Sequence, residues 1–203
     1  GKIVGWFEGG SEFGPRALGH RSILCDPRGE DAKERLNSRV KHREAFRPFA
    51  PVILAEHVQE WFETDRRHPI MDFMLEVCPI RHSLVERIPG VVHVDGTGRL
   101  QTIASEDNPR LYEVISAFYR RTGVPMLINT SFNVMGEPLV ETPDDALRCL
   151  LTTGIDYCFL EDMLVAKDDS HKSIFELIPV LDRHFLLHVA GPNSAGVRTA
   201  HGP

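Results

Sequence analysis

Two arginines in a short glycine-rich segment have the residue type and spacing best suited to chemistry in this sequence. Arg16 and Arg21 lie five positions apart in Glu12-Phe-Gly-Pro-Arg-Ala-Leu-Gly-His-Arg-Ser22. Glycine lets a backbone approach a ligand closely and proline fixes a backbone dihedral, so this segment is expected to form a tight loop. The planar guanidinium group suits phosphate and carboxylate oxygens. The loop therefore predicts an anion site, and the alternative is that its arginines pair with nearby acids such as Glu12.

A second group of cations lies between Lys41 and Arg47, at the end of a predicted helix. Basic side chains at a helix C-terminus stabilise the helix electrostatically, so most of this run is explained without a ligand. Arg47 differs because phenylalanine and proline residues surround it, and a buried arginine needs a partner. That partner is either a structural carboxylate or the phosphate of a ligand.

Further candidates follow in the second half of the chain. Arg99 ends the turn sequence Asp95-Gly-Thr-Gly-Arg99, which alone is a weak indication of function. Asn129 and Ser131 lie at the end of a predicted buried strand, where α/β proteins commonly place ligands, although a polar turn that caps the strand is the simpler explanation of this segment taken alone. Ser131 has no histidine or aspartate near it in sequence, so it is not predicted to be a nucleophile.

Apolar periodicity and turn residues predict the elements that must position these side chains. The clearest helix begins at Asn108-Pro109, carries one apolar stripe and ends at Gly123. Other helices are expected over Asp31–Lys41, Glu56–Phe62, Thr142–Leu151 and Ser173–Leu181. Strands are expected over Ile3–Phe7, Arg21–Cys25, Val52–Leu54, Met71–Val77, Val91–Asp95, Pro125–Asn129, Asp156–Leu160 and Met163–Ala166. The pattern is mixed α/β of the α+β type, without strict βαβ alternation.

Composition narrows the class of protein. The net charge of −6 argues against general nucleic-acid binding, whereas residues 14–47 hold nine basic and five acidic side chains, which suits a small anionic ligand. Four widely spaced cysteines without a Cys-x-x-Cys pair indicate free thiols in a reducing cytoplasm. No apolar run reaches about 18 residues, so no membrane span is expected. The sequence starts without methionine and directly in a strand, so it is expected to be a piece of a longer protein.

Five ordered motifs give the sequence a specific resemblance. They are Glu12–Leu24, Asp26-Pro-Arg28, the Lys41–Pro51 segment with its Phe-Arg-Pro-Phe-Ala-Pro ending, Asp95–Arg99, and Asn129-Thr-Ser-Phe-Asn-x-x-Gly-Glu-Pro138. From about Gly1 to Lys167 the chain resembles the C-terminal domain of the O-carbamoyltransferases that modify antibiotics and nodulation factors. One departure is Gly10, where the family usually has an arginine, so the chain is expected to lack one contact if that arginine belongs to the site.

The resemblance implies a fold and an activity. Residues 1–187 would form a YrdC-like domain, a twisted mixed sheet with flanking helices. The resemblance does not extend beyond Lys167, and the residue types of 188–203 by themselves predict a disordered tail. The domain would bind carbamoyl phosphate and ATP, with Mg²⁺ accompanying the nucleotide, and would form carbamoyl adenylate in the cytoplasm. A metal-binding N-terminal domain resembling actin-like ATPases, absent from this sequence, would transfer the carbamoyl group to a hydroxyl. No metal of that N-terminal domain is expected here.

The resemblance also implies roles for individual residues. Arg16, Lys41 and Arg47 would be catalytic cations, and Arg99 would bind substrate with Asn129 and Ser131. Cations from four segments converging in one cleft would bind phosphate and neutralise developing charge. Two alternatives remain open: a YrdC-like module that binds a nucleotide or RNA without chemistry, and a degenerate domain that only docks against its N-terminal partner.

Overall fold

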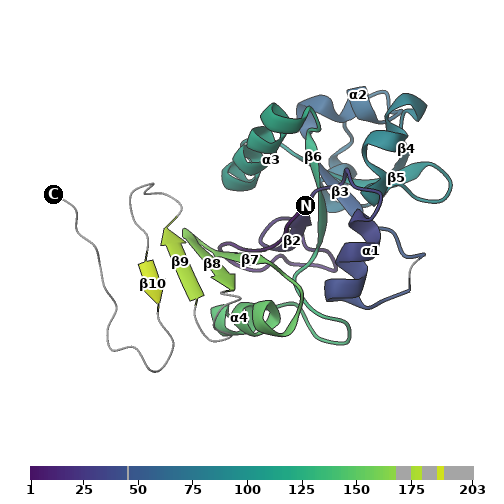
Figure 1. Ribbon diagram of the computed structural model, residues 1–203. Helices are drawn as coiled ribbons and strands as arrows, with labels where there is room; N and C mark the ends of the chain where they lie inside the picture. Colours follow the sequence, from purple (N-terminus) through teal and green to yellow (C-terminus); the bar gives the residue numbers. More distant parts are fainter. Residues whose placement is uncertain (45, 168–174, 180–186, 190–203) are drawn as a thin grey trace.

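A computed structural model of the chain describes residues 1–44, 46–167, 175–179 and 187–189 (Figure 1). Its strands are β1 (Ile3–Phe7), β2 (Arg21–Cys25), β3 (Ala50–Leu54), β4 (Glu76–Pro79), β5 (Thr97–Ile103), β6 (Met126–Ser131), β7 (Tyr157–Leu160), β8 (Met163–Lys167), β9 (Phe175–Pro179) and β10 (Leu187–Val189). Its α-helices are α1 (Ala32–Leu36), α2 (Val58–Trp61), α3 (Pro109–Thr122) and α4 (Pro143–Thr152). Single turns of other helix types are the π-helical turn Asn37–Lys41 and the 3₁₀ turns Ala55–His57, Pro69–Phe73, His82–Arg87 and Pro89–Val91.

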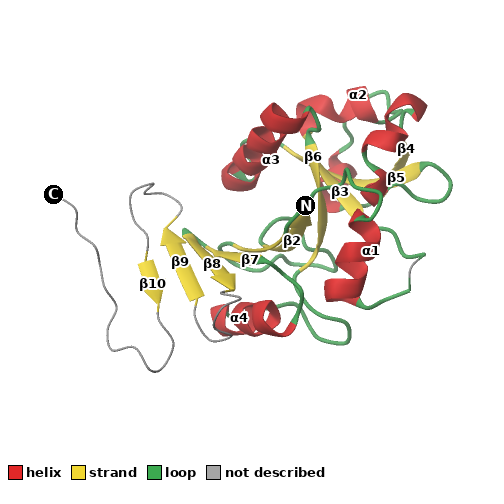
Figure 2. Cartoon of the chain, viewed as in Figure 1, coloured by secondary structure: helices red, strands yellow, loops and turns green. Residues whose placement is uncertain are grey.

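The described strands form one mixed sheet in the order β10-β9-β8-β7-β1-β2-β6-β3-β5-β4. Two neighbouring pairs, β1 with β7 and β3 with β5, are parallel, and the other neighbouring pairs are antiparallel. The sheet with its flanking helices confirms the predicted mixed α/β fold (Figure 2). Its centre is β1, which lies between β2 and β7 and aligns Val4 with Tyr157.

Each face of the sheet buries its own set of apolar side chains. Alternation along β1 sends Trp6 to one face and Ile3 and Phe7 to the other. The face of Trp6 is covered by α3, whose apolar stripe contributes Leu111 and Ile115. The opposite face is covered by α1 and α4, and its core extends beneath the irregular segment 55–96. Figure 2 shows α3 and α4 on opposite sides of the central strands.

Gly5 of β1 lies where the sheet has no room for a side chain. A Cβ atom at Gly5 would lie 2.5 Å from Cζ of Phe132, a fully buried ring. We therefore expect Gly5→Ala to lower the free energy of unfolding by about 2–3 kcal/mol, because overpacking forces side chains out of their preferred rotamers. Urea denaturation measures this change. Gly10→Ala is the matched control, since nothing lies within 4 Å of a Cβ there and stability should not change. Equal stability of the two variants would contradict this packing.

Three predicted elements are wrong. In the predicted strand Met71–Val77, residues 71–73 end a 3₁₀ turn that Pro69 opens, and Met74 caps this turn with φ +56°. Only the residues from Glu76 onward form a strand. The predicted strand Val91–Asp95 is also absent from the described structure. Val91 is the last residue of the 3₁₀ turn Pro89–Val91, and the next strand starts only at Thr97.

The third error concerns the predicted helix Ser173–Leu181. Its described part, Phe175–Pro179, is the strand β9, which pairs antiparallel with β8. This pairing outweighs helix propensity, which is a weak preference when a neighbouring strand edge is available. Residues 173, 174, 180 and 181 lie outside the described part of the chain. Of the predicted tail 188–203, residues 188 and 189 belong to β10 and residues 190–203 lie outside the described residues.

None of the helices that the structure describes has the length and apolar character needed to cross a membrane.

Candidate functional site

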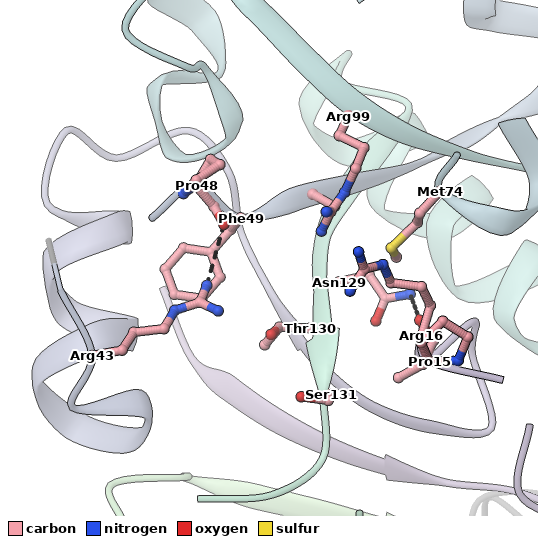
Figure 3. A pocket seen from close by; sticks show the side chains of 12 residues that line it. Pro15, Arg16, Arg43, Pro48, Phe49, Met74, Arg99, Asn129, Thr130 and Ser131 are labelled. Atoms are coloured by element: carbon pink, nitrogen blue, oxygen red, sulfur yellow. Dashed lines mark hydrogen bonds between the residues drawn. The ribbon is translucent and has the colours of Figure 1, made fainter. Parts of the chain in front are cut away.

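A small polar cavity of about 90 Å³ lies at the end of β6, beside the start of β3 and the middle of β5 (Figure 3). It is lined by residues from six separate segments, namely Pro15, Arg16, Ala17, Arg43, Pro48, Phe49, Ala50, Met74, Arg99, Asn129, Thr130 and Ser131. Four of the six residues predicted for the site therefore meet here: Arg16, Arg99, Asn129 and Ser131. The volume suits a group the size of phosphate, since one water occupies roughly 30 Å³ of liquid.

The carboxylate of Glu12 organises the loop that brings Arg16 to this cavity. Its Oε1 atom accepts backbone hydrogen bonds from Leu18 at 2.6 Å and His20 at 2.7 Å. It also lies 3.3 Å from the backbone nitrogen of Arg21. Glu12 therefore stabilises the backbone of the loop, and among the described residues it forms no ion pair with Arg16. The guanidinium of Arg16 remains directed to the cavity.

Arg21 has a structural role. Its side chain is buried and donates to the carbonyl oxygens of Glu8 at 3.0 Å and Gly9 at 2.8 Å. Its guanidinium stacks 3.5 Å from the centre of the Phe7 ring. These contacts fix the beginning of the loop to β1, so of the two arginines in the glycine-rich segment only Arg16 lines the cavity.

Three guanidinium groups surround the cavity: Arg16 from the loop, Arg43 from the segment after the π-helical turn, and Arg99 from β5 (Figure 3). Within the described ranges none of the three forms an ion pair with a carboxylate. Burial lowers the pKa of Arg99, and the charge of Arg16 lowers it further. Burial likewise lowers the pKa of Arg43, with contributions from Arg47 and Arg99. The mutual repulsion of these cations favours an anion between them.

Two of these arginines also keep hydrogen-bonding capacity unused. The Nε atoms of Arg43 and Arg99 are buried and have no partner among the described residues. Unpaired buried donors are costly, and a ligand oxygen would satisfy them.

The acceptor groups of the cavity lie on β6. Asn129 is buried, and its Nδ2 donates to the carbonyl oxygen of Ala17 at 3.1 Å and to Oε1 of Gln101 at 2.7 Å. Its Oδ1 is buried without a hydrogen-bond partner in the described structure. Gln101 is held in turn by donation to the carbonyl oxygen of Leu18 at 2.7 Å. Asn129 thus presents an unsatisfied acceptor beside three cations, a combination that suits a ligand with both anionic oxygens and N–H groups.

Lys41 lies behind Ser131 and does not line the cavity. Its Nζ donates to two oxygens of Ser131, the carbonyl oxygen at 2.6 Å and Oγ at 3.1 Å. It also lies 3.0 Å from the carbonyl oxygen of Asn133 and 2.8 Å from its Oδ1. Burial, together with the charge of Arg43, lowers the pKa of this amine to about 7. Lys41 therefore holds the segment 131–133 in place.

The helix predicted over Asp31–Lys41 is confirmed, but its second half is the π-helical turn Asn37–Lys41. A π turn holds one more residue than an α turn and often occurs at functional sites. It ends at His42 in the left-handed conformation, with φ +47°. Asn37 then fixes the next residue by accepting from the backbone nitrogen of Arg43 at 3.1 Å and donating to its carbonyl oxygen at 2.6 Å. This change of direction points Arg43 into the cavity.

Arg47 lies away from the cavity. Its side chain is 56% exposed, and its nearest carboxylate is that of Glu44 at 3.6 Å. It lines a different hollow together with Lys33 and Phe49. The structure therefore does not bring Arg47 together with the other predicted site residues.

Arg43 and Thr130 line the cavity but were not predicted as site residues. The basic run 41–47 contains Arg43, so composition pointed to the right segment. The ring of Phe49 lies 4.4 Å from the Arg43 guanidinium, and the carbonyl of Pro48 accepts from its Nη2 at 3.2 Å. A further correction concerns Arg99, which belongs to the strand β5 and not to a turn.

Gly10, the departure from the expected motif, lies at a second cavity of about 420 Å³ on the other side of the loop. Phe13 and Phe73 are exposed at this cavity. Nothing lies within 4 Å of a Cβ atom at Gly10, so an arginine side chain would have space there.

Metal-binding side chains are not clustered in the described part of the chain, where no three of His, Cys, Asp and Glu are placed to hold an ion together.

Comparison with known proteins identifies the family of the chain. Residues 1–167 match the family described as Carbamoyltransferase C-terminus. The chain is 48% identical over 167 residues to nodulation protein NolNO of Sinorhizobium fredii, which covers 82% of this chain and 25% of that protein. It is 46% identical over 170 residues to nodulation protein NolO of Bradyrhizobium diazoefficiens, covering 82% of this chain and 30% of the relative.

A third relative carries a named activity. The chain is 38% identical over 155 residues to a 3'-hydroxymethylcephem-O-carbamoyltransferase of Amycolatopsis lactamdurans, covering 76% of this chain and 29% of that enzyme. The chain thus spans less than a third of the length of each of these relatives. On the match over 167 residues, the chain belongs to the carbamoyltransferase C-terminal family.

Proposed function

We propose that this chain is the part of an O-carbamoyltransferase that binds carbamoyl phosphate and ATP and forms carbamoyl adenylate, in the cytoplasm. The observation that supports the proposal most directly is the group of Arg16, Arg43 and Arg99, which have no carboxylate partner in the described structure and face one small cavity. A metal-binding N-terminal domain of the same protein would then transfer the carbamoyl group to a hydroxyl.

The cavity supplies matching groups for both ends of carbamoyl phosphate. The three guanidinium groups would bind the phosphate and neutralise the charge that grows on it as it leaves as inorganic phosphate. Water would take its place on the carbamoyl carbon to give carbamate, whose oxygen would attack the α-phosphate of ATP and displace pyrophosphate. Asn129 and Ser131 would hold the carbamoyl amide through hydrogen bonds. The chemistry needs no protein nucleophile. ATP would bring Mg²⁺, which is held mainly by phosphate oxygens and water and by few protein ligands.

Titration calorimetry of the chain with carbamoyl phosphate, and then with ATP and Mg²⁺, tests the proposal. We expect saturable binding of carbamoyl phosphate that Arg16→Ala weakens by about tenfold or more, because a hydrogen bond to a charged group contributes about 1.5–3 kcal/mol. Arg121→Ala is the matched control, since Arg121 is an exposed residue of α3. If the folded chain binds no carbamoyl phosphate, the proposal is wrong.

A second prediction compares how much Arg43 and Arg47 each contribute to the binding of carbamoyl phosphate. Arg43→Ala should weaken carbamoyl phosphate binding by about tenfold, whereas Arg47→Ala should have the smaller effect, because only the first guanidinium lines the cavity. The same calorimetric titration compares the two variants. A larger loss for Arg47→Ala would contradict the assignment of Arg43 as the ligand contact of this segment.

We do not extend the proposal to RNA. Polymer binding is favoured by a basic surface, whereas the net charge of this chain is −6 and the three arginines face a cavity of about 90 Å³. A gel-shift experiment with double-stranded RNA at several salt concentrations would detect such an activity directly.

A further inference from the structure

We propose that Asn133 is a positioning residue that fixes the hydroxyl of Ser131 as a hydrogen-bond acceptor, so that the cavity selects acyl phosphates carrying an N–H group. The inference rests on the proposed function and adds to it a reason why the cavity would prefer carbamoyl phosphate over acyl phosphates that lack an N–H group. It assigns a role to Asn133, which does not line the cavity itself. Its ligand class is an acyl phosphate whose acyl group ends in an amide.

The amide of Asn133 has one orientation that satisfies all its contacts. Its Nδ2 lies 2.9 Å from the carbonyl oxygen of Glu137, and only the NH₂ group of an amide can donate to a carbonyl. Its Oδ1 therefore faces Lys41 at 2.8 Å and Ser131 Oγ at 2.7 Å. The contact with Glu137 thus determines which atom Asn133 offers to Ser131.

This orientation decides where the single proton of the Ser131 hydroxyl goes. At 2.7 Å from Oδ1 of Asn133, Ser131 Oγ acts as the donor, because an amide oxygen only accepts. The amine of Lys41 lies 3.1 Å from the same Oγ, and in its protonated form, below about pH 7, it has only donors to offer. With its proton bound to Asn133, Ser131 has only lone-pair density left to offer to a molecule in the cavity.

Asn129 presents a second fixed acceptor by the same logic. Both hydrogens of its Nδ2 are directed to Ala17 and Gln101, so Oδ1 is the atom left without a partner. The cavity then offers two acceptors beside three cations. A carbamoyl group has two N–H donors for these acceptors, whereas the isosteric methyl group of acetyl phosphate has none and leaves both acceptors unpaired.

Calorimetric affinities of three ligands on the full 203-residue chain test the inference. The ligands are carbamoyl phosphate, acetyl phosphate and inorganic phosphate. We expect the unaltered chain to prefer carbamoyl over acetyl phosphate by about tenfold or more. Asn133→Ala should reduce this preference by about five- to tenfold while inorganic phosphate binds as before, because the hydroxyl of Ser131 becomes free to rotate and the arginines remain in place.

Asn133→Asp is the conservative variant. A carboxylate cannot donate to the carbonyl of Glu137, but both of its oxygens accept, so either one can take the bonds from Ser131 and Lys41. The preference for carbamoyl phosphate should therefore be retained even if the negative charge weakens the binding of all three ligands alike. The ratio of the affinities for carbamoyl phosphate and acetyl phosphate separates a change of preference from a general loss of binding.

The possible outcomes separate the inference from the proposed function. An unchanged preference in Asn133→Ala, or an equal loss of affinity for all three ligands, overturns the positioning role of Asn133 and leaves the proposed function standing. Failure of the unaltered chain to bind carbamoyl phosphate overturns the proposed function, and the inference with it.

Discussion

Arg99→Met is expected to lower the affinity for carbamoyl phosphate by about 100-fold without lowering thermal stability. A guanidinium can form two parallel hydrogen bonds with phosphate, each strengthened by charge, which accounts for a loss of this size. In the ligand-free chain the same group has no carboxylate partner in the described structure, and its Nε is buried and unpaired. Burial and Arg16 both lower the pKa of Arg99, which means that its charge is disfavoured in the folded state.

Calorimetry and thermal denaturation of the same preparations measure the two effects. Methionine retains much of the volume and apolar contact of the arginine stem, so we expect the melting temperature to stay the same or to rise by about 2–4 °C. Arg121→Met on the exposed side of α3 is the control and should alter neither quantity. A large loss of stability in Arg99→Met would mean that this arginine is structural, which would remove it from the proposed site.

Lys41→Met is expected to have the largest effect on stability, a loss of about 3–5 kcal/mol. The Nζ atom lies within hydrogen-bonding distance of four oxygens of Ser131 and Asn133, and its removal leaves buried acceptors unpaired. Each unsatisfied buried group costs about 1–3 kcal/mol. Urea denaturation measures the loss, and Lys2→Met is a suitable control because the Lys2 side chain is 64% exposed.

The same lysine also predicts how stability depends on pH. Its pKa is about 7 in the folded chain and about 10.5 in the unfolded chain. Between these values the unfolded chain binds a proton that the folded chain does not, so the free energy of unfolding rises with pH. From about pH 7 to about pH 8.5 the gain should be about 1–2 kcal/mol, and Lys41→Met should lack it.

The upper limit of this window comes from the cysteines. Burial raises the pKa of Cys149 to about 11 and that of Cys158 to about 12, from an ordinary value of 9.0. Above pH 9 their ionisation in the unfolded chain therefore reduces stability, which opposes the effect of Lys41. A stability that stays constant between about pH 7 and about pH 8.5 would contradict the low pKa of Lys41.

The sequence predicted long periodic elements well and irregular segments poorly. The helix after Asn108 is confirmed as α3, with its N-cap at Asn108 and its end at Gly123, because one apolar stripe and two end signals agree. The strands predicted near Met71 and Val91 were wrong, because a short apolar run looks the same in sequence whether it forms a strand or a buried turn. The strand β9 was read as a helix because its pairing with β8 is a tertiary contact that local sequence does not contain.

The site shows the same division between local and tertiary information. Arg16, Arg99, Asn129 and Ser131 were predicted from residue types and motifs, and they meet in one cavity. Their functional roles remain predictions. Arg43 was missed because the π turn and the left-handed His42 determine which cation points inward. The sequence of a basic run does not show where a helix gains a residue per turn.

The central position of β1 has a consequence for how the chain is made. Val4 of β1 pairs with Leu24 of β2 on one side. Its partner on the other side is Tyr157 of β7, about 150 positions later in the chain. At a synthesis rate of roughly 5–20 residues per second, β1 waits about 8–30 seconds on the ribosome for β7. Throughout that time the middle of the future sheet is an open edge with unpaired backbone groups, which is a template for wrong pairing. The centre of the sheet is therefore completed only after β7 has been synthesised, and the interval before that leaves the edge of β1 open to wrong pairing.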